Sequence, residues 1–188
     1  MALTQTAIYS TFVLINLLIR GDHMHGVLFD SFEHNRWATA LLLQTCSDLS
    51  AEQLATTVVG SYGDIIATFN HIIRADARYL QHLSGKAPDW LINREETSDF
   101  ARLQVWAEEA ASNWAEFLTM PFDAEQIVTL VTGDYEIHGG ALIAQALHHS
   151  NIHREQICAI LTSLGIEPPD LQPWAYAHET GRGHNRST

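Results

Sequence analysis

The chain has 188 residues, a mass of 21.0 kDa and 46% hydrophobic residues, which fits one folded domain with a sizeable core and excludes a disordered protein. Ten basic residues against 22 acidic ones give a formal net charge of −12. Because nucleic acids and anionic membranes are bound by basic surfaces, this balance argues against both kinds of partner.

The first 23 residues differ in character from the rest of the chain. Residues 7–19 are largely apolar, but this run is shorter than the ~20 residues that cross a bilayer. The first basic residue, Arg20, comes after the apolar run, whereas a secretory signal carries its basic residues before it. We therefore expect residues 1–23 to be a leader outside the fold, and residues 24–167 to form the domain.

Three long helical patterns follow the leader. The first spans about 27–47, and the second follows the turn at 60–63 and ends at Gly85, where a glycine is typical of a helix C-cap. The third opens after 97–99, whose Thr, Ser and Asp suit an N-cap, and it stops before Pro121.

The last third of the chain predicts a hairpin, a fourth helix and a tail. Residues 127–131 and 135–137 are two short extended pieces around a glycine turn, which indicates a small β-hairpin. The fourth helix starts after Gly140 and continues to Leu164. Residues 168–188 are rich in Pro, Gly and polar residues, so we expect a tail without an ordered helix. Together these elements predict an all-α fold, an antiparallel four-helix bundle with a hairpin inserted before the last helix.

The fourth helix carries a pair of histidines, His149 and His153. Because they are four residues apart, both imidazoles lie on one face of the helix, one turn apart. Apolar residues such as Leu142 and Ile157 share that face, so the pattern predicts imidazoles that point into the bundle core. An unpaired polar group there costs ~1–3 kcal/mol, and a divalent metal bound by both rings would satisfy them together.

A metal site needs a third ligand, and His71 on the second helix is the best-placed candidate. The small residues Thr68 and Ala75 lie beside it on the helix and leave room for a bound group. The apolar periodicity of the second helix is compatible with His71 as a ligand but does not require it. A plain helical bundle whose histidines bind no metal is therefore an open alternative on this evidence.

Three segments, one in each of the first, second and fourth helices, carry a family resemblance. They are 32–38 (FEHNRWA), 71–80 (HIIRADARYL) and 149–157 (HSNIHREQI). With these motifs the chain resembles the DinB-like (YfiT-like) superfamily of metal-binding proteins over about residues 28–176. The spacing H-x-x-x-H-R-x-Q-I, with a histidine about eighty residues upstream, is an uncommon arrangement.

The resemblance implies a four-helix bundle that binds a divalent metal ion, often nickel or zinc. One histidine of the second helix and two of the fourth hold the ion in the family, which assigns His71, His149 and His153 here. Several members are thiol-dependent transferases or isomerases that use bacillithiol, mycothiol or a similar thiol, and many others have no established activity. Members are often dimers.

The sequence departs from the family's pattern at three positions outside the ligand set. Glu155 stands where many members have glycine, His34 where tyrosine is commoner, and Asp76 where glutamate is usual. These departures leave the ligand positions intact and the identity of the substrate and of the thiol open.

Three neutral imidazoles would leave the metal its full +2 charge, which lowers the pKa of a bound water to about 7 and deprotonates a bound thiol more readily still. We therefore favour a metal-dependent enzyme, either a thiol S-transferase or a small-molecule hydrolase, acting on a small electrophile. The alternative is a non-catalytic metal-binding bundle with a sensing or stress-response role.

Four further residues are candidates for supporting roles at this site. Gln156, Asn35 and Asp76 are candidates to fix the free ring nitrogens of the ligands. His34 is a candidate fourth ligand or general base, and a surface or capping histidine is the plainer interpretation.

Two cysteines, Cys46 and Cys158, are too few for a disulfide scaffold and fit core positions in a cytoplasmic protein. Ile66 and Ile73 are expected to be exposed on the second helix, which predicts self-association as a homodimer. The expected partners are thus a small-molecule substrate and a second copy of the chain, with no nucleic acid and no stable membrane contact.

Overall fold

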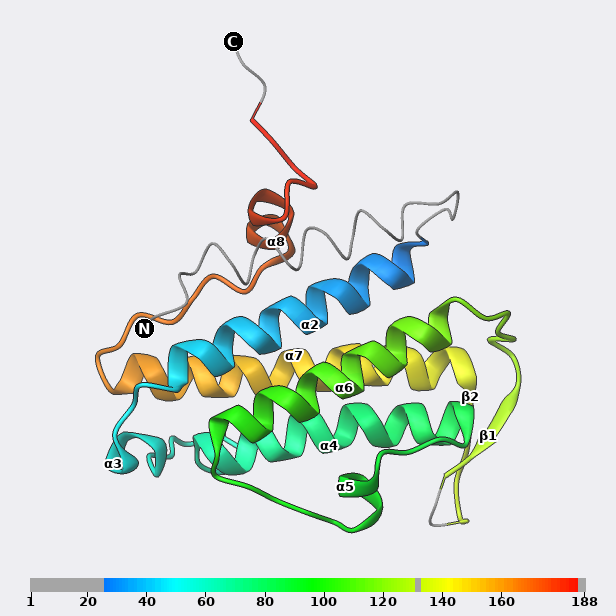
Figure 1. The fold of residues 1–188 in the computed structure, drawn as a ribbon, viewed down its shortest axis with the longest axis horizontal. Coiled ribbons are helices and arrows are strands. Elements are labelled where there is room, and N and C mark those ends of the chain that lie inside the picture. The colour runs from blue at the N-terminus through cyan, green and yellow to red at the C-terminus, as the bar shows by residue number, and fades with distance from the viewer. Residues whose placement is uncertain (1–25, 131–132, 186–188) are drawn as a thin grey trace.

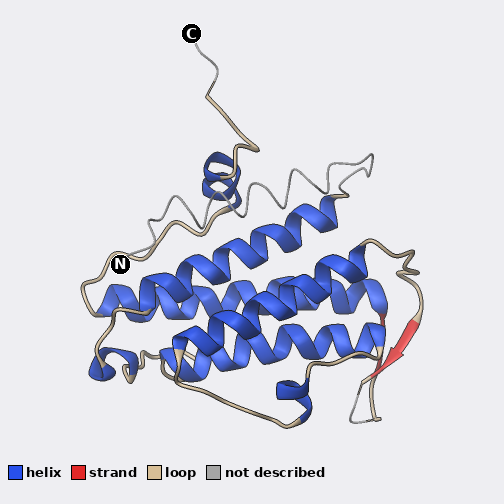
Figure 2. Cartoon of the chain, in the orientation of Figure 1, coloured by secondary structure: helices blue, strands red, loops and turns tan. Residues whose placement is uncertain are grey.

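The protein is an all-α bundle in the computed structural model, which describes residues 26–130 and 133–185. The described residues form seven helices and two strands: α2 (Val27–Cys46), α3 (Ala51–Leu54), α4 (Ile65–Ser84), α5 (Asp89–Ile92), α6 (Phe100–Leu118), β1 (Ile127–Thr129), β2 (Glu136–His138), α7 (Gly139–Ser163) and α8 (Pro173–Glu179). The four long helices α2, α4, α6 and α7 run side by side, and the short elements lie around them (Figures 1 and 2). The predicted fold class is confirmed, and the predicted leader lies outside the described residues.

Each long helix packs against two others, which closes the bundle. Helices α2 and α4 both contact α6 on one side and α7 on the other. The core between them holds most of the large apolar side chains, and Trp114 stacks on Phe32 near the hairpin end with ring centroids 4.2 Å apart. Helices α4 and α7 are therefore direct neighbours, and this interface is the one that carries the predicted histidines.

The structure confirms the predicted caps at Gly85 and in the segment 97–99, and it adds a cap at Asp64. Asp64 accepts a hydrogen bond from the backbone N–H of Ala67 at 2.7 Å at the start of α4, and Gly85 ends that helix with a left-handed φ of 74°. Asp99 caps α6 in the same way by accepting from Ala101 at 3.0 Å. These caps satisfy backbone groups that a helix end otherwise leaves unpaired.

Helix α7 begins earlier than predicted, because its two glycines belong to its first turn. A Cβ on Gly139 would lie 2.5 Å from the ring of Phe122, and one on Gly140 would lie 3.2 Å from the Cβ of Ala124. The glycines therefore allow the helix start to approach the preceding loop closely. The predicted hairpin is confirmed as two three-residue strands that pair antiparallel, with Val128 opposite Ile137.

The expectation of a tail without an ordered helix was wrong. Residues 173–179 form α8, which packs against α2. Pro173 occupies the start of this helix, where its missing N–H is harmless and its fixed φ suits the helix. Tyr176 is buried and its ring lies 5.7 Å from that of Trp37 on α2. The proline content of the tail argues against a helix, whereas Pro173 is the first residue of one.

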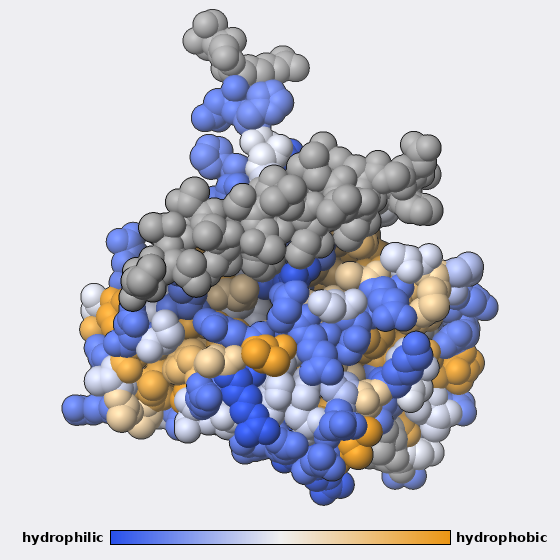
Figure 3. Space-filling view, viewed as in Figure 1, coloured by the Kyte–Doolittle hydropathy of each residue, from blue (hydrophilic) through white to orange (hydrophobic). Residues whose placement is uncertain are grey.

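The surface is mixed, and the apolar residues expected to drive self-association are not exposed. Ile73 is buried at 1% exposure and Ile66 packs against the core, so this basis for the homodimer prediction was wrong. On the face shown in Figure 3, hydrophobic residues are scattered among hydrophilic ones. Cys46 and Cys158 are buried free thiols, as expected, and burial raises their pKa to about 12 and about 11. None of the described helices is long and apolar enough to cross a membrane.

Candidate metal site

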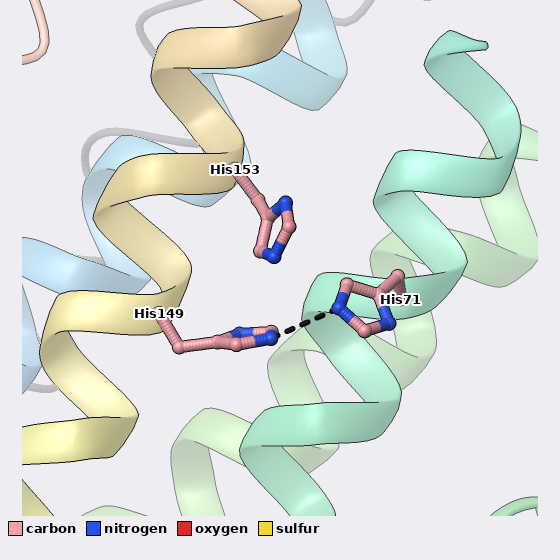
Figure 4. A group of neighbouring side chains, drawn as sticks. All are labelled: His71, His149 and His153. Atoms are coloured by element: carbon pink, nitrogen blue, oxygen red, sulfur yellow. Dashed lines mark hydrogen bonds between the residues drawn. The ribbon is translucent and has the colours of Figure 1, made fainter. Parts of the chain in front are cut away.

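Three histidines meet at the interface of α4 and α7. His71 comes from α4, and His149 and His153 come from consecutive turns of α7 (Figure 4). One ring nitrogen of each lies within 4.8 Å of the other two, and the ring centroids are 4.4–4.7 Å apart. The structure thus brings together the three residues that the sequence selects as candidate ligands.

The closest pair of nitrogens has the spacing of two ligands on one ion. The Nε2 atoms of His71 and His149 are 2.9 Å apart. Two nitrogens that each lie 2.0–2.1 Å from a zinc ion are about 2.8–3.4 Å apart for bond angles between octahedral and tetrahedral values. The third histidine contributes a nitrogen within 4.8 Å of the other two, and imidazole nitrogens suit nickel and zinc, so the donor set fits a divalent ion of this type.

The histidines lie at the rim of the core rather than inside it. The buried stripe of α7 passes through Ala146, Ser150 and Arg154, and His149 and His153 flank it, half-buried. The prediction that both rings point into the core was therefore wrong, because the two histidines lie beside the buried face of α7 and not on it. The consequence is that the site lies at the edge of the bundle, between α4 and α7.

Both rings of the closest pair are neutral at pH 7. Burial lowers the pKa of His149 to about 4, with further lowering by the neighbouring His153, His71 and His148. Burial, His153 and Arg74 also lower the pKa of His71 below its usual value. Neutral imidazole is the form that ligates a metal, since it carries a free lone pair.

His153 is oriented by Gln156, one turn further along α7. Its Nδ1 donates to Oε1 of Gln156 over 2.8 Å, which leaves Nε2 free to face the other two rings. The same oxygen accepts from the backbone N–H of Tyr62 at 3.0 Å, and the amide nitrogen of Gln156 donates to the carbonyl of Gly60 at 2.9 Å. Gln156 therefore has the contact expected of a ligand-orienting residue and also anchors the loop before α4.

Tyr62, on that loop, covers one side of the cluster. Its ring stacks on His71 with centroids 3.8 Å apart and planes 13° apart, and it meets His153 edge-on at 5.4 Å. Tyr79 meets His149 edge-on at 5.5 Å. These two contacts were not predictable from the sequence, because they depend on how a loop and a neighbouring helix are placed.

His149 has one polar atom that the described residues leave unpaired. Its Nδ1 is buried and has no hydrogen-bond partner among them. Its Nε2 points at His71, so the ring is turned toward the cluster and not toward solvent (Figure 4). A ligand on Nε2 would keep the proton on Nδ1.

Asn35 and Asp76 lie close to the site but do not contact its histidines through their hydrogen bonds. Asn35 donates to Oδ2 of Asp76 at 3.1 Å, and Ser150 donates to Oδ1 of Asp76 at 2.5 Å. Arg154 donates to Oδ1 of Asn35 and to Thr39. The expectation that Asn35 and Asp76 fix a ligand's free ring nitrogen therefore has no contact to support it. We refer to Asn35, Thr39, Asp76, Ser150 and Arg154 as the buried polar network.

Burial shifts the pKa values of the two charged residues of the buried polar network, Asp76 and Arg154. Burial raises the pKa of Asp76 to about 6, although the Ser150 and Asn35 hydrogen bonds and the charge of Arg154 work in the opposite direction. Burial likewise lowers the pKa of Arg154 to about 10, so the guanidinium stays protonated at pH 7. Sequence reasoning missed Ser150 and Thr39, which carry no pattern of their own.

His34 lies outside the histidine cluster. One ring nitrogen is 2.7 Å from the carbonyl oxygen of Leu171, and the ring contacts those of Trp37 and Tyr176. These contacts join α2 to the segment that leads into α8, and they make His34 a part-buried residue that belongs neither to the cluster nor to a helix cap. His148 is exposed, as expected from its place on the opposite side of α7.

The comparison with known proteins agrees with the fold and with the histidine cluster. The sequence model of the DinB family matches residues 24–185, which include all four long helices and α8. A comparison with curated proteins finds no significant match. The family match covers most of the chain, and the chain belongs to the DinB family.

Proposed function

We propose that this protein binds one divalent metal ion, nickel or zinc, through His71, His149 and His153, and that it is a metal-dependent enzyme. The observation that carries the proposal is the convergence of three imidazoles from two helices, with two Nε2 atoms 2.9 Å apart. The reaction we favour is transfer of a low-molecular-weight thiol to a small electrophile, with hydrolysis of such a compound as the second possibility.

The donor set supports this chemistry. A divalent ion held by three neutral nitrogens keeps its positive charge and open positions, and it acts as a Lewis acid toward a thiol or a water. The cluster of candidate ligands in the described part of the chain contains no carboxylate and no thiol that would lower that charge.

The residues around the cluster have distinct roles in this proposal. Gln156 holds His153 in the tautomer whose Nε2 faces the ion. Tyr62 packs on the outer face of His71 and limits water on that side, while Tyr79 borders His149. The substrate then approaches along the half-buried rim between α4 and α7.

A non-catalytic, metal-sensing role is the second candidate. It is favoured by the three hydrogen bonds of Gln156, because they connect a proposed ligand to the backbone of the loop that carries Tyr62. Metal binding at His153 would then alter the position of this loop, which a partner could detect.

Elemental analysis of protein purified without a tag tests metal binding. We expect one nickel or zinc ion per chain in the wild type and less than a tenth of that in the His149→Ala and His153→Ala variants. His148→Ala is the matched control, because His148 is exposed and adjacent to His149 but faces away from the cluster. Absence of a stoichiometric ion from the wild type, or equal loss in the control, would contradict the proposal.

Turnover separates the two candidate functions. The metal-loaded protein is incubated with a low-molecular-weight thiol and a small electrophile, and formation of the thioether is followed. Thioether formation that depends on both His149 and the metal supports the enzyme. Metal binding without turnover across a panel of thiols and electrophiles supports the sensing role.

A further inference from the structure

Asp76, a member of the buried polar network, makes hydrogen bonds to each of the other three long helices. Its carboxylate accepts from Asn35 of α2 and from Ser150 of α7, and its backbone carbonyl accepts from the indole N–H of Trp114 of α6 at 3.1 Å. Asp76 itself lies on α4 and is only 8% exposed. Asp76 therefore bonds to every other long helix through its side chain or its backbone carbonyl, and these bonds hold the four helices in one arrangement.

Arg154 extends the network to Thr39 and determines how the Asn35 amide is oriented. Its guanidinium is 2% exposed and donates to Oδ1 of Asn35 and to the hydroxyl of Thr39, both on α2. Arginine only donates and an ionised carboxylate only accepts, so Asn35 must present its oxygen to Arg154 and its nitrogen to Asp76. A shift of α7 by one residue along its axis would break several of these bonds, and an unpaired buried charge is costly.

Three members of the network, Ser150, Arg154 and Asp76, lie close in sequence to the three histidines. Ser150 directly follows His149, Arg154 directly follows His153, and Asp76 lies five residues after His71 on the same helix. The bonds that fix Ser150 and Arg154 therefore also fix the height and the rotation of the two α7 histidines relative to α4. None of the network's hydrogen bonds reaches an imidazole.

We infer that Asp76, Ser150 and Arg154 are positioning residues of the metal site. They set the separation of the nitrogens of His71, His149 and His153 by locking α7 against α4 and α2, without contacting the ion or its ligands. This inference rests on the proposed function. Buried charged side chains need not stabilise a fold more than apolar residues would. A positioning role explains why a buried network with charged members lies next to the histidines.

Nickel titration calorimetry on folded variants tests the inference. We expect Asp76→Asn to weaken nickel binding by about tenfold or more, in the range found when residues that support metal ligands are removed. Ser150→Ala, which removes one of the hydrogen bonds to Asp76, should weaken it less, by several-fold. Circular dichroism and thermal unfolding establish that each variant is folded at the temperature of the titration.

Asn70→Ala is the matched control. Asn70 is also a buried polar residue of α4 and directly precedes His71, and its hydrogen bonds go to Ile66 and Thr97, not to the buried polar network or to a histidine of the cluster. A general loss of stability near the ligand would weaken nickel binding in this control as well. We expect its affinity to stay within twofold of the wild type although its melting temperature falls.

Two results would overturn the inference: wild-type nickel affinity in folded Asp76→Asn, or equal weakening in Asn70→Ala. If Asp76→Asn does not fold, Ser150→Ala decides the matter, and wild-type affinity there has the same consequence. If the wild type binds no nickel, the proposed function fails, and the positioning role is then judged in the metal-free protein. Imidazole nitrogen resonances should report a changed His71–His149 contact in Ser150→Ala and an unchanged one in Asn70→Ala.

Discussion

The side chain of Gln156 joins two parts of the site that are far apart in the sequence. It orients His153 three residues away on the same helix and holds the backbone of Gly60 and Tyr62 on the loop before α4. Gln156 was a candidate to fix a free ring nitrogen of a ligand, and its contact with His153 is local, three residues along the same helix. Its two contacts with the loop were not visible, because they join residues more than ninety positions apart.

Replacing Gln156 by leucine should weaken metal binding roughly tenfold, since His153 would lose the acceptor for its Nδ1 proton. Gln104→Leu, an equal change at an exposed position of α6, is the control and should leave the affinity unchanged. Calorimetric titration with nickel measures both. An unaltered affinity in Gln156→Leu would show that the orientation of His153 does not depend on this amide.

The pKa of His149 predicts how acid affects the metal-free protein. Its value of about 4 in the folded state lies below the usual 6.5, so the unfolded chain binds the proton more tightly. The contribution of His149 to stability is therefore complete above pH 6.5 and is lost as the pH falls toward 4. Asp76, with its pKa raised to about 6, has the opposite dependence between pH 4 and 6.

Urea unfolding at pH 7.5 and pH 5, with a chelator present, isolates the His149 effect. The wild type should lose more stability between these values than His149→Gln does, because the contribution of Asp76 is common to both and cancels in the difference. Equal losses would mean that His149 titrates normally in the folded protein.

Among the elements, α8 shows what a compositional argument cannot detect. Its sequence lies in a stretch that is rich in proline, glycine and polar residues, yet it forms a helix that buries Tyr176 against α2. The contact with His34 and Trp37 supplies the stabilisation, and it lies more than 130 residues away in the sequence. In contrast, the C-terminal end of α4 and the start of α6 were predictable, because Gly85 and Asp99 act on neighbouring backbone groups.

Tyr176→Ala should lower the free energy of unfolding by about 2–3 kcal/mol, since it removes a large buried ring. Trp174→Ala is the control on the same helix, because Trp174 is 82% exposed, and it should change the stability by less than about 0.5 kcal/mol. Chemical denaturation measures both. If the two variants are equally stable, α8 does not contribute to the fold through Tyr176.

At the scale of the whole molecule, the four long helices pack against one another, and the site lies at the edge of the bundle between α4 and α7. The fold class and the three histidines were predictable, because helical periodicity, caps and the His149–His153 spacing are local features. The depth of the histidines was not predictable, since the buried stripe of α7 is set by Ser150 and Arg154, whose polar side chains are buried by partners 74 to 119 residues away. The hydrogen bonds of Asn35 and Asp76 were not predictable either, since they join residues 41 to 119 positions apart, and none of them reaches a histidine of the cluster.

X-ray absorption spectroscopy of the nickel- or zinc-loaded protein tests the central claim most directly, because it counts the imidazoles around the metal. We predict three imidazole nitrogens per ion at about 2.0–2.1 Å, and two in the His71→Ala variant. A bound ion with one imidazole or none, or with a ligand set that His71→Ala leaves unchanged, would contradict the three-histidine site.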